Sequence, residues 1–263
     1  MEAAFFDLDK TIIAKSSVLA FGRPFYREGL LSRRAIAKSV YAQLVYMLVG
    51  ADEEKMEKVR VAMSAMTRGW NRDHIASIVR ETLEEVIEPI IYAEAIELIE
   101  DHHAAGREVV IVSSSPGEVV EPLKEFLGAD RAIATVAQVD EKGNYTGELE
   151  FYAYGPTKAE AIAKLAARDG IDLDASYAYS DSVTDLPMLE SVGHPVAVNA
   201  DRDLAKVAQE RGWETRNFER PIRLRDRVPV PPAGPTIAVS SALVVAGAGV
   251  AVWWWLRRRE HAA

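Results

Sequence analysis

The chain has 263 residues, which is enough for one large domain or for one domain with a smaller module. Its formal net charge of -9 excludes a general nucleic-acid binder, which would carry a basic face. The absence of cysteine excludes disulfide bonds, thiolate metal sites and a cysteine nucleophile, and it fits a reducing compartment.

The chain begins with a predicted buried strand over residues 3–8, an apolar run that contains two phenylalanines. Residues 16–88 then form a predicted all-helical module, because apolar residues recur there at steps of three and four. Its helices are predicted over residues 33–49, 53–66 and 73–86, with Ser32 and Asn71 as N-caps of the first and the last.

From residue 92 onward, predicted helices alternate with predicted strands. The strands are expected at 108–112, 132–139, 145–151, 177–179 and 195–198, and the helices at 92–105, 118–127, 158–168, from about 185, and at 203–211. The turn at 141–144 predicts that two of the strands form a hairpin. This alternation predicts an α/β fold with a parallel sheet and helices on both faces. We expect His102 and His103 at the surface of their helix.

The C-terminal region differs in composition from the rest. Residues 219–236 are rich in arginine and proline and are predicted to be a stiff linker. Residues 237–256 carry no charge, have three tryptophans near their C-terminal end and are followed by the basic tail 257–263. A helix of 20 residues would span about 30 Å, so a transmembrane helix is predicted, with a buried core helix as the alternative. Because the N-terminus does not read as a signal peptide, a single-pass anchor with the catalytic part in the cytoplasm is expected.

Polar residues follow three of the apolar runs, where the carboxyl ends of parallel strands would form a site. Asp7 and Asp9 follow the first run, Ser113 ends another, and Asp181 follows a third. Two nearby carboxylates repel unless a proton or cation joins them, and Mg²⁺ prefers such hard oxygen ligands. We therefore predict a magnesium site with Asp7, Asp9 and Asp181 as ligands.

These residues suit phosphoryl transfer. Asp7 can attack phosphorus to form an aspartyl-phosphate, and Asp9 can protonate the leaving oxygen and later activate water. Ser113 can donate to a phosphate oxygen, and Lys158 can offset charge on the transferring group. Each has a simpler alternative: Lys158 as a surface lysine, Ser113 in a turn, and Asp181 or Asp185 as a helix cap.

Taken together, the motifs resemble the haloacid dehalogenase superfamily, in the branch of the phosphoserine phosphatases (subfamily IB), over about residues 3–218. The stretch Asp7-Leu8-Asp9-Lys10-Thr11 resembles the first motif, Val112-Ser113 the second, Lys158 the third, and Asp181 with Asp185 the fourth. The resemblance implies a Rossmann-like catalytic core of residues 1–15 and 89–218, with 16–88 as an inserted cap that selects substrate.

The resemblance also implies roles for single residues. Asp7 would be the nucleophile, Asp9 the acid/base whose backbone carbonyl binds magnesium, and Asp185 a support of the metal shell. Ser16 departs from the phosphoserine phosphatases, which carry a glutamate that holds the substrate amine about nine residues after the nucleophile. Phosphoserine is therefore in doubt.

Three functions remain open. The first is a magnesium-dependent phosphatase acting on a phosphorylated small molecule, or on a lipid phosphate because of the membrane anchor. The second is a phosphotransferase that uses the same intermediate. The third is a catalytically silent, membrane-tethered interaction module. The sequence does not indicate an oligomeric state.

Overall fold

A computed structural model describes residues 1–31, 61 and 64–220 of the chain. The predicted N-cap Ser32, the predicted helix over 33–49 and most of that over 53–66 lie outside these residues. The predicted span 237–256, the tail 257–263 and nearly all of the predicted linker also lie outside them. Within the described part, no helix combines the length and the apolar character needed to cross a bilayer.

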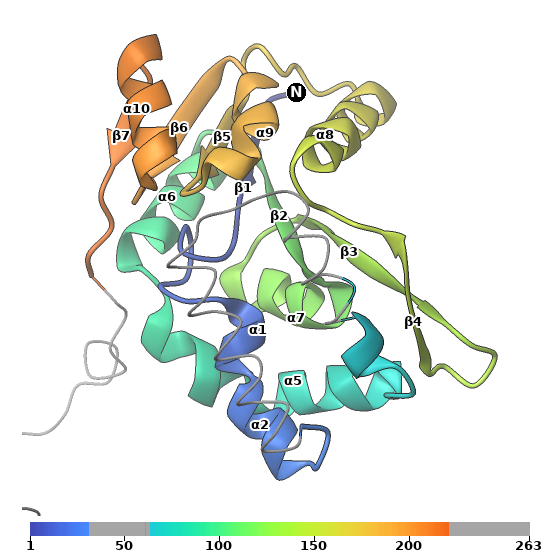
Figure 1. The fold of residues 1–263 in the computed structure, drawn as a ribbon. Helices are drawn as coiled ribbons and strands as arrows, with labels where there is room; N and C mark the ends of the chain where they lie inside the picture. Colours follow the sequence, from blue (N-terminus) through green and yellow to red (C-terminus); the bar gives the residue numbers. More distant parts are fainter. Residues whose placement is uncertain (32–60, 62–63, 221–263) are drawn as a thin grey trace, which may run out of the picture. The chain divides into compact units, whose positions relative to one another are not determined.

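Seven strands of the described chain form one sheet (Figure 1). They are β1 (Ala3–Phe6), β2 (Glu108–Pro116), β3 (Arg131–Val139), β4 (Tyr145–Phe151), β5 (Tyr177–Ser180), β6 (His194–Val198) and β7 (Glu214–Arg216). Their order is β4-β3-β2-β1-β5-β6-β7, and all neighbours are parallel except β3 and β4, which form the predicted hairpin. The short strand β7 was not predicted, since three residues give too little pattern to detect.

Helices cover both faces of the sheet, which confirms the predicted layers. The first face carries α6 (Ala93–Ala104) and α7 (Gly117–Leu127), with α5 (Arg72–Ile87) packed against α7. The second face carries α8 (Pro156–Asp169), α9 (Leu186–Glu190) and α10 (Arg202–Arg211). Short helices α1 (Ser17–Ala20), α2 (Gly22–Arg27), η1 (Glu88–Ile90) and η2 (Val183–Asp185) complete the described elements.

The central strand β1 shows why its sequence is apolar throughout. Ala4 and Phe6 pack into the core on the first face, whereas Ala3 and Phe5 pack on the second. Successive side chains of a strand point to opposite faces, so a strand covered on both sides must be apolar at every position. Burial of each phenylalanine contributes roughly 1.5–3 kcal/mol to stability.

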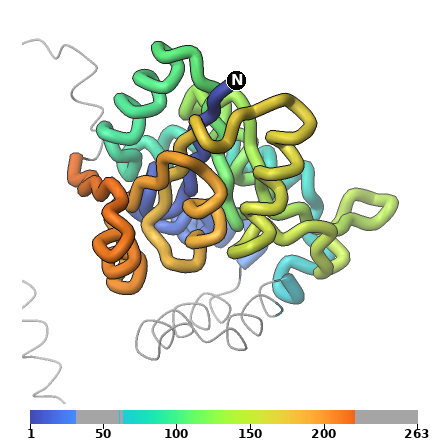
Figure 2. The backbone as a smooth tube through the Cα atoms, turned by 90° about the horizontal axis from the view of Figure 1, so that it is seen from above, coloured from blue at the N-terminus to red at the C-terminus, as the bar shows by residue number. Residues whose placement is uncertain are grey.

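The described part of residues 16–88 is helical, as predicted, and Asn71 caps α5 by accepting a hydrogen bond from the backbone of His74 at 3.1 Å. The segment that leads into α5 is bonded to the β3–β4 hairpin. The N–H of Gly69 donates to the carbonyl of Tyr145 at 2.8 Å, and the N–H of Tyr145 donates to the carbonyl of Trp70 at 2.9 Å. Both views show this contact (Figures 1 and 2). The hairpin thus anchors the returning end of the insertion, while the exact boundaries of core and cap stay a prediction.

One surface assignment was wrong. His102 is 4% exposed, and its Nε2 lies 2.8 Å from the hydroxyl of Tyr179 on β5. Its ring also meets Phe6 edge-on, with centroids 5.9 Å apart. The partner is 77 residues away in sequence, so the helix pattern alone did not show that this position faces the sheet. His103 is exposed, as predicted, although its Nε2 lies 3.0 Å from Asp130.

The sheet order defines the place where a site is expected. The chain runs from β1 to β2 and β3 on one side, and then to β5, β6 and β7 on the other. The order therefore reverses at β1, and in open α/β sheets ligands bind beyond the carboxyl ends of the strands at such a point.

Candidate active site

Asp7 and Asp9 lie on the loop that leaves the central strand. The N–H of Asp7 still pairs with the carbonyl of Tyr179 at 2.9 Å. The chain then turns, because the carbonyl of Leu8 accepts from the N–H groups of Ile12 and Ile13 at 3.0 and 3.1 Å. Asp7 is 7% exposed. Its carboxylate is therefore a buried acidic group at the switch point of the sheet.

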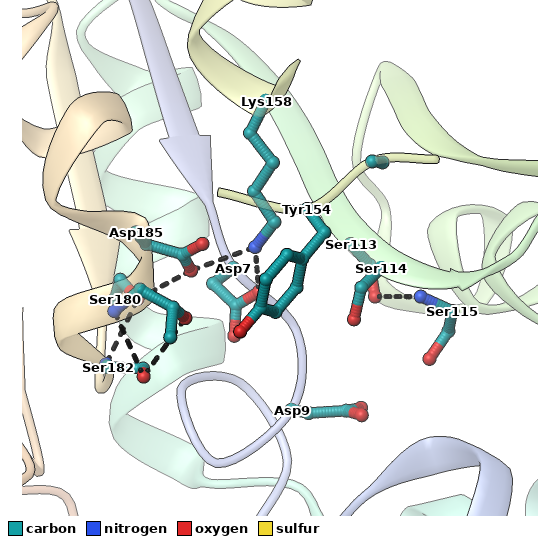
Figure 3. Close-up of polar contacts among 12 residues, drawn as sticks. Asp7, Asp9, Ser113, Ser114, Ser115, Tyr154, Lys158, Ser180, Ser182 and Asp185 are labelled. Atoms are coloured by element: carbon teal, nitrogen blue, oxygen red, sulfur yellow. Dashed lines mark hydrogen bonds and ion pairs between the residues drawn. The ribbon is translucent and has the colours of Figure 1, made fainter. Parts of the chain in front are cut away.

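Lys158 reaches this carboxylate from helix α8. Its Nζ lies 2.6 Å from Asp7 Oδ1 and 2.8 Å from Asp185 Oδ2, and the side chain is only 3% exposed (Figure 3). The turn before the helix needs Gly155, whose φ of 56° lies in the region that favours glycine. Lys158 is thus a buried bridging cation, and the surface-lysine alternative is wrong.

Asp185 holds the other side of this lysine. It stands at the N-cap position of α9 but makes no side-chain capping bond. Its carboxylate instead accepts from Lys158 and from the hydroxyl of Ser180, each at 2.8 Å. The helix-cap alternative is therefore wrong for this residue, which orients Lys158.

Asp181 follows β5, the strand next to β1, and is 7% exposed. Burial raises its pKa to about 7, and the negative charges of Asp185 and Asp201 add to the rise. Lys10 opposes it, with its Nζ 3.9 Å from Asp181 Oδ2 and its side chain 65% exposed. Lys10 lowers the pKa of Asp181 more than either neighbouring carboxylate raises it, but burial outweighs this effect.

Asp7 is electrostatically linked to both of these aspartates. Burial is the main cause that raises the pKa of Asp7, and the charges of Asp185 and Asp181 raise it further, whereas Lys158 lowers it. Burial acts to lower the pKa of Lys158, but Asp7 and Asp185 outweigh it and the lysine pKa is raised. Asp7 and Asp185 therefore share one buried ammonium group, and the buried carboxylate of Asp181 adds a further negative charge beside them.

This excess of negative charge fits a divalent cation. Mg²⁺ binds few carboxylates and completes its shell with carbonyl oxygens, water and phosphate oxygens. No group of three or more acidic, histidine or cysteine side chains within the described ranges is arranged to hold a metal. A magnesium ion would accordingly use the carboxylates of Asp7 and Asp181, and the predicted backbone carbonyl of Asp9 would have to replace a third carboxylate.

Asp9 is separated from the lysine bridge (Figure 3). Its Oδ1 accepts from the backbone N–H of Ser17 at 2.9 Å. Burial raises the pKa of Asp9, and the hydrogen bonds from Ser17 and Ser16 act in the opposite direction. A carboxyl group with a raised pKa near a nucleophile is suited to proton transfer.

Ser113 lies on β2, beside β1, and is 1% exposed. The strand continues through Pro116, so the turn alternative is wrong. The hydroxyl of Ser113 accepts from the N–H of Ser115 at 3.2 Å. The structure thus brings Asp7, Lys158 and Asp185 into direct contact, with Asp181 close enough to raise the pKa of Asp7. Asp9 lies on the same loop as Asp7, and Ser113 lies on the neighbouring strand β2 (Figure 3).

Three residues at the site were not predicted. Tyr154 precedes α8, and its ring lies beside Lys158 and Asp7 in the close-up (Figure 3). Asp201 follows β6 and accepts from the N–H of Val183 at 3.0 Å. Ser17 contacts Asp9. Asp201 could have been found, because it also follows an apolar strand, whereas the other two give no sequence signal of their own.

The chain matches a known protein family and has similar relatives in bacteria. The model of the haloacid dehalogenase-like hydrolase family matches residues 4–190. The chain is 55% identical to the inhibition of morphological differentiation protein of Streptomyces azureus, over 99% of this chain and 95% of that protein. It is 51% identical to a probable phosphatase of Mycobacterium tuberculosis, over 98% of this chain and 89% of that protein.

Two solved structures are similar to this chain in fold. A Bordetella pertussis protein of unknown function matches with a TM-score of 0.71 at 27% identity, over 81% of this chain and 97% of that one. A phosphoserine phosphatase, solved as an analogue of its phospho-aspartyl intermediate, shares the fold with a TM-score of 0.59 at 20% identity, over 83% and 94%.

The chain therefore belongs to the haloacid dehalogenase-like hydrolase family. Within that family it is an enzyme of the phosphoric monoester hydrolase class and resembles the phosphoserine phosphatase branch, as the motifs predicted.

Proposed function

We propose that the protein hydrolyses a phosphate monoester with Mg²⁺ through an aspartyl-phosphate on Asp7. The observation that carries this proposal is the buried bridge from Lys158 to Asp7 and Asp185 at the switch point of the sheet. A lysine held there can stabilise negative charge on a transferring phosphoryl group while it keeps the nucleophile oriented.

The residues divide the chemistry into two steps. A carboxylate oxygen of Asp7 attacks phosphorus, the bond to the ester oxygen breaks, and Asp9 gives its proton to that oxygen. Asp9 then takes a proton from water, which attacks the phosphorus, breaks the bond to Asp7 and releases phosphate. Ser113 and Lys158 hold phosphoryl oxygens in both steps. Magnesium, when bound, offsets the charge of the phosphate and of Asp7 and Asp181.

The test is a phosphate-release screen of the chain against a panel of phosphate esters with Mg²⁺, together with acid quenching to trap the phosphoenzyme. We expect release from at least one ester and a covalent phosphate that Asp7→Asn abolishes. If the enzyme turns over but no covalent phosphate can be trapped and Asp7→Asn retains its rate, the proposed nucleophile is wrong.

Two other functions use the same fold. A phosphotransferase would pass the phosphoryl group from Asp7 to an alcohol, so added alcohols would yield new phosphate esters at the expense of free phosphate. A catalytically silent module would release no phosphate from any ester. The intact set of Asp7, Asp9, Ser113, Lys158 and Asp181 favours turnover, and the buried ion pairs of Lys158 favour it over a silent module.

For the substrate, we propose an ester other than phosphoserine. Ser16 has no charge with which to hold a substrate amine, and its backbone leads directly into α1 beside Asp9. Phosphoserine therefore belongs in the panel as a direct comparison. A kcat/KM for phosphoserine above that for amine-free esters of similar size would contradict this proposal.

A lipid phosphate is the substrate class that the predicted membrane span favours. A cytoplasmic catalytic domain held at a bilayer by residues 237–256 would meet lipid head groups at high effective concentration. Removal of residues 236–263 should free the protein from membranes and preserve activity on a soluble ester. The truncated enzyme should also prefer lipid phosphates presented in detergent over small soluble esters. Preference for the soluble esters would contradict the lipid assignment, and sedimentation of the truncated chain with membranes would contradict the anchor.

A further inference from the structure

Asp9 is oriented by a residue that begins the first helix after the nucleophile loop. The backbone N–H of Ser17 donates to Asp9 Oδ1 at 2.9 Å, over a separation of eight residues. Ser17 is fully buried, at 0% exposure. The side chains of Ser17 and Ser16 also hydrogen-bond to this carboxylate. A carboxylate has two equivalent oxygens, so the bonds from Ser17 and its neighbour determine which oxygen remains free to face a ligand.

The same serine is joined to the strand that carries Ser113. The hydroxyls of Ser17 and Ser115 lie 2.8 Å apart, and Ser115 is 4% exposed. The N–H of Ser115 donates in turn to the hydroxyl of Ser113 at 3.2 Å. A continuous path of hydrogen bonds therefore runs from Asp9 through Ser17 and Ser115 to Ser113, across 98 residues of sequence between the two hydroxyls.

This path connects two parts of the proposed site that must keep a fixed separation. The ester oxygen that leaves and the phosphoryl oxygens that stay belong to one phosphorus atom. A proton donor misplaced by about 1 Å relative to the phosphate can cost roughly 100-fold in rate. The buried hydroxyl pair is suited to hold that separation, because a buried hydroxyl that loses its partner costs about 1–3 kcal/mol.

We propose that Ser17 is a positioning residue that aims the carboxyl group of Asp9 at the leaving oxygen, and that its hydroxyl bond to Ser115 fixes this aim relative to Ser113. The proposal rests on the proposed phosphatase function. It assigns Ser17 no contact with the substrate: the residue acts only through Asp9.

Two substitutions at one position separate the backbone bond of Ser17 from the bonds of its hydroxyl. Ser17→Ala removes the hydroxyl with its bonds to Ser115 and Asp9, and retains the backbone N–H that donates to Asp9. Ser17→Pro removes the N–H as well. The site is compatible with proline because Ser17 is the first residue of α1, and Ser16 before it has φ -66° and ψ 127°. Ser17→Ala is thus the matched control for the backbone bond.

The readout is the dependence of kcat/KM on the leaving group, measured with p-nitrophenyl phosphate, phenyl phosphate and glycerol phosphate. A nitrophenolate leaves without a proton, whereas an alkoxide needs one, and a general acid contributes about 10²- to 10⁴-fold. We expect Ser17→Pro to lose roughly 100-fold on glycerol phosphate and less than about 3-fold on p-nitrophenyl phosphate. Ser17→Ala should lose about 10-fold on glycerol phosphate, and it should likewise lose much less on p-nitrophenyl phosphate.

Ser115→Ala and the double variant with Ser17→Ala complete a cycle. Because the two hydroxyls share one bond, the double variant should be no worse than the poorer single variant on glycerol phosphate. This cycle keeps the proposal testable if Ser17→Pro fails to fold, which a thermal melt would show. Equal losses on all three esters, or fully additive losses in the cycle, would overturn the proposal. A wild-type enzyme that releases no phosphate from any ester would instead refute the proposed function.

Discussion

The ammonium group of Lys158 lies 2.6 Å from the carboxylate of Asp7, although 151 residues separate the two in sequence. Asp185, 27 residues further along, holds the same ammonium group at 2.8 Å. Each partner is nearly inaccessible to water, so their attraction is little screened and their separation strongly affects both charge states. The stability of the folded core and its proposed chemistry therefore depend on the same three side chains.

Replacement of the proposed nucleophile should separate folding from turnover. Asp7→Asn is nearly isosteric and removes one of the two buried carboxylates that share Lys158. We expect the fold to persist and kcat to fall by roughly 10³-fold or more, because the amide cannot attack phosphorus. Circular dichroism and phosphate release measure the two effects. Comparable turnover in a folded variant would contradict the assignment of Asp7.

Removal of the bridging cation should cost stability as well as activity. Lys158→Met leaves Asp7 and Asp185 buried without their partner, and loss of one member of a buried ion pair costs about 3–5 kcal/mol. Urea unfolding measures this loss. Lys164→Met is the matched control, since Lys164 is an exposed lysine on the same helix. Similar unfolding free energies for the two variants would show that the bridge contributes no net stability.

Magnesium should bind the folded protein and stabilise it. The excess negative charge around Asp7 and Asp181 is expected to be relieved by the ion, so the melting temperature should rise with Mg²⁺ and fall with EDTA. Asp181→Asn should weaken the rise and increase the Mg²⁺ concentration needed for half-maximal activity by about 10-fold or more. A melting temperature of the wild type that does not respond to Mg²⁺ or EDTA would contradict the metal site.

The buried imidazole of His102 predicts loss of stability in acid. Burial, followed by the charges of Arg107 and Arg216, lowers its pKa from 6.5 to about 4. In the unfolded chain this imidazole is therefore protonated below about pH 6.5, whereas in the folded chain it is protonated only below about pH 4. The unfolding free energy should fall across that window by up to about 1.4 kcal/mol per pH unit.

The measurement is urea unfolding at several pH values for the wild type and for His102→Gln, which retains a polar partner for Tyr179 but does not titrate. Carboxylates with raised pKa values act in the opposite direction in both proteins, so the difference between them isolates the histidine. His103→Gln, on the exposed side of the same helix, is the matched control. Parallel curves for wild type and His102→Gln would refute the prediction.

Tyr154 should contribute to substrate binding. Its ring stacks on Tyr152 with centroids 5.3 Å apart, and its backbone N–H donates to the hydroxyl of Thr157 at 3.0 Å. These contacts hold the residue beside Lys158 at the start of α8 (Figure 3). We expect Tyr154→Phe to lose roughly 2- to 10-fold in kcat/KM, as for one hydrogen bond, and Tyr154→Ala to lose more. Tyr152→Phe retains the stacked ring and serves as control; a Tyr154→Ala variant with wild-type kinetics would exclude this role.

Much of the fold follows from local pattern. The apolar run before Asp7 predicted a central strand, and the alternation of strands and helices after residue 92 predicted a parallel sheet with helices on both faces. Periodicity also predicted α5 and its cap at Asn71. These features depend on residues close together in sequence, which is why pattern was sufficient. The three-residue strand β7 was too short to show a recognisable pattern.

The candidate site was predictable where the order of strands makes its residues converge. Asp7, Ser113 and Asp181 each follow or end an apolar run, and parallel strands bring such ends to one edge. Lys158 was a weak candidate because it begins a helix and does not follow an apolar strand. Only the structure shows that it is buried between two aspartates.

By itself the sequence determined every strand of the described sheet except β7, and that acidic and hydroxyl groups meet at the carboxyl ends of the strands, because strand direction and side-chain alternation are local properties. Only the tertiary structure decided that Lys158 pairs with Asp7 and Asp185, that Ser17 holds Asp9, and that His102 faces Tyr179. Each of these pairs forms only when elements that are distant in sequence, or separated by a turn, pack together. The resulting burial then determines the charge states of the paired side chains.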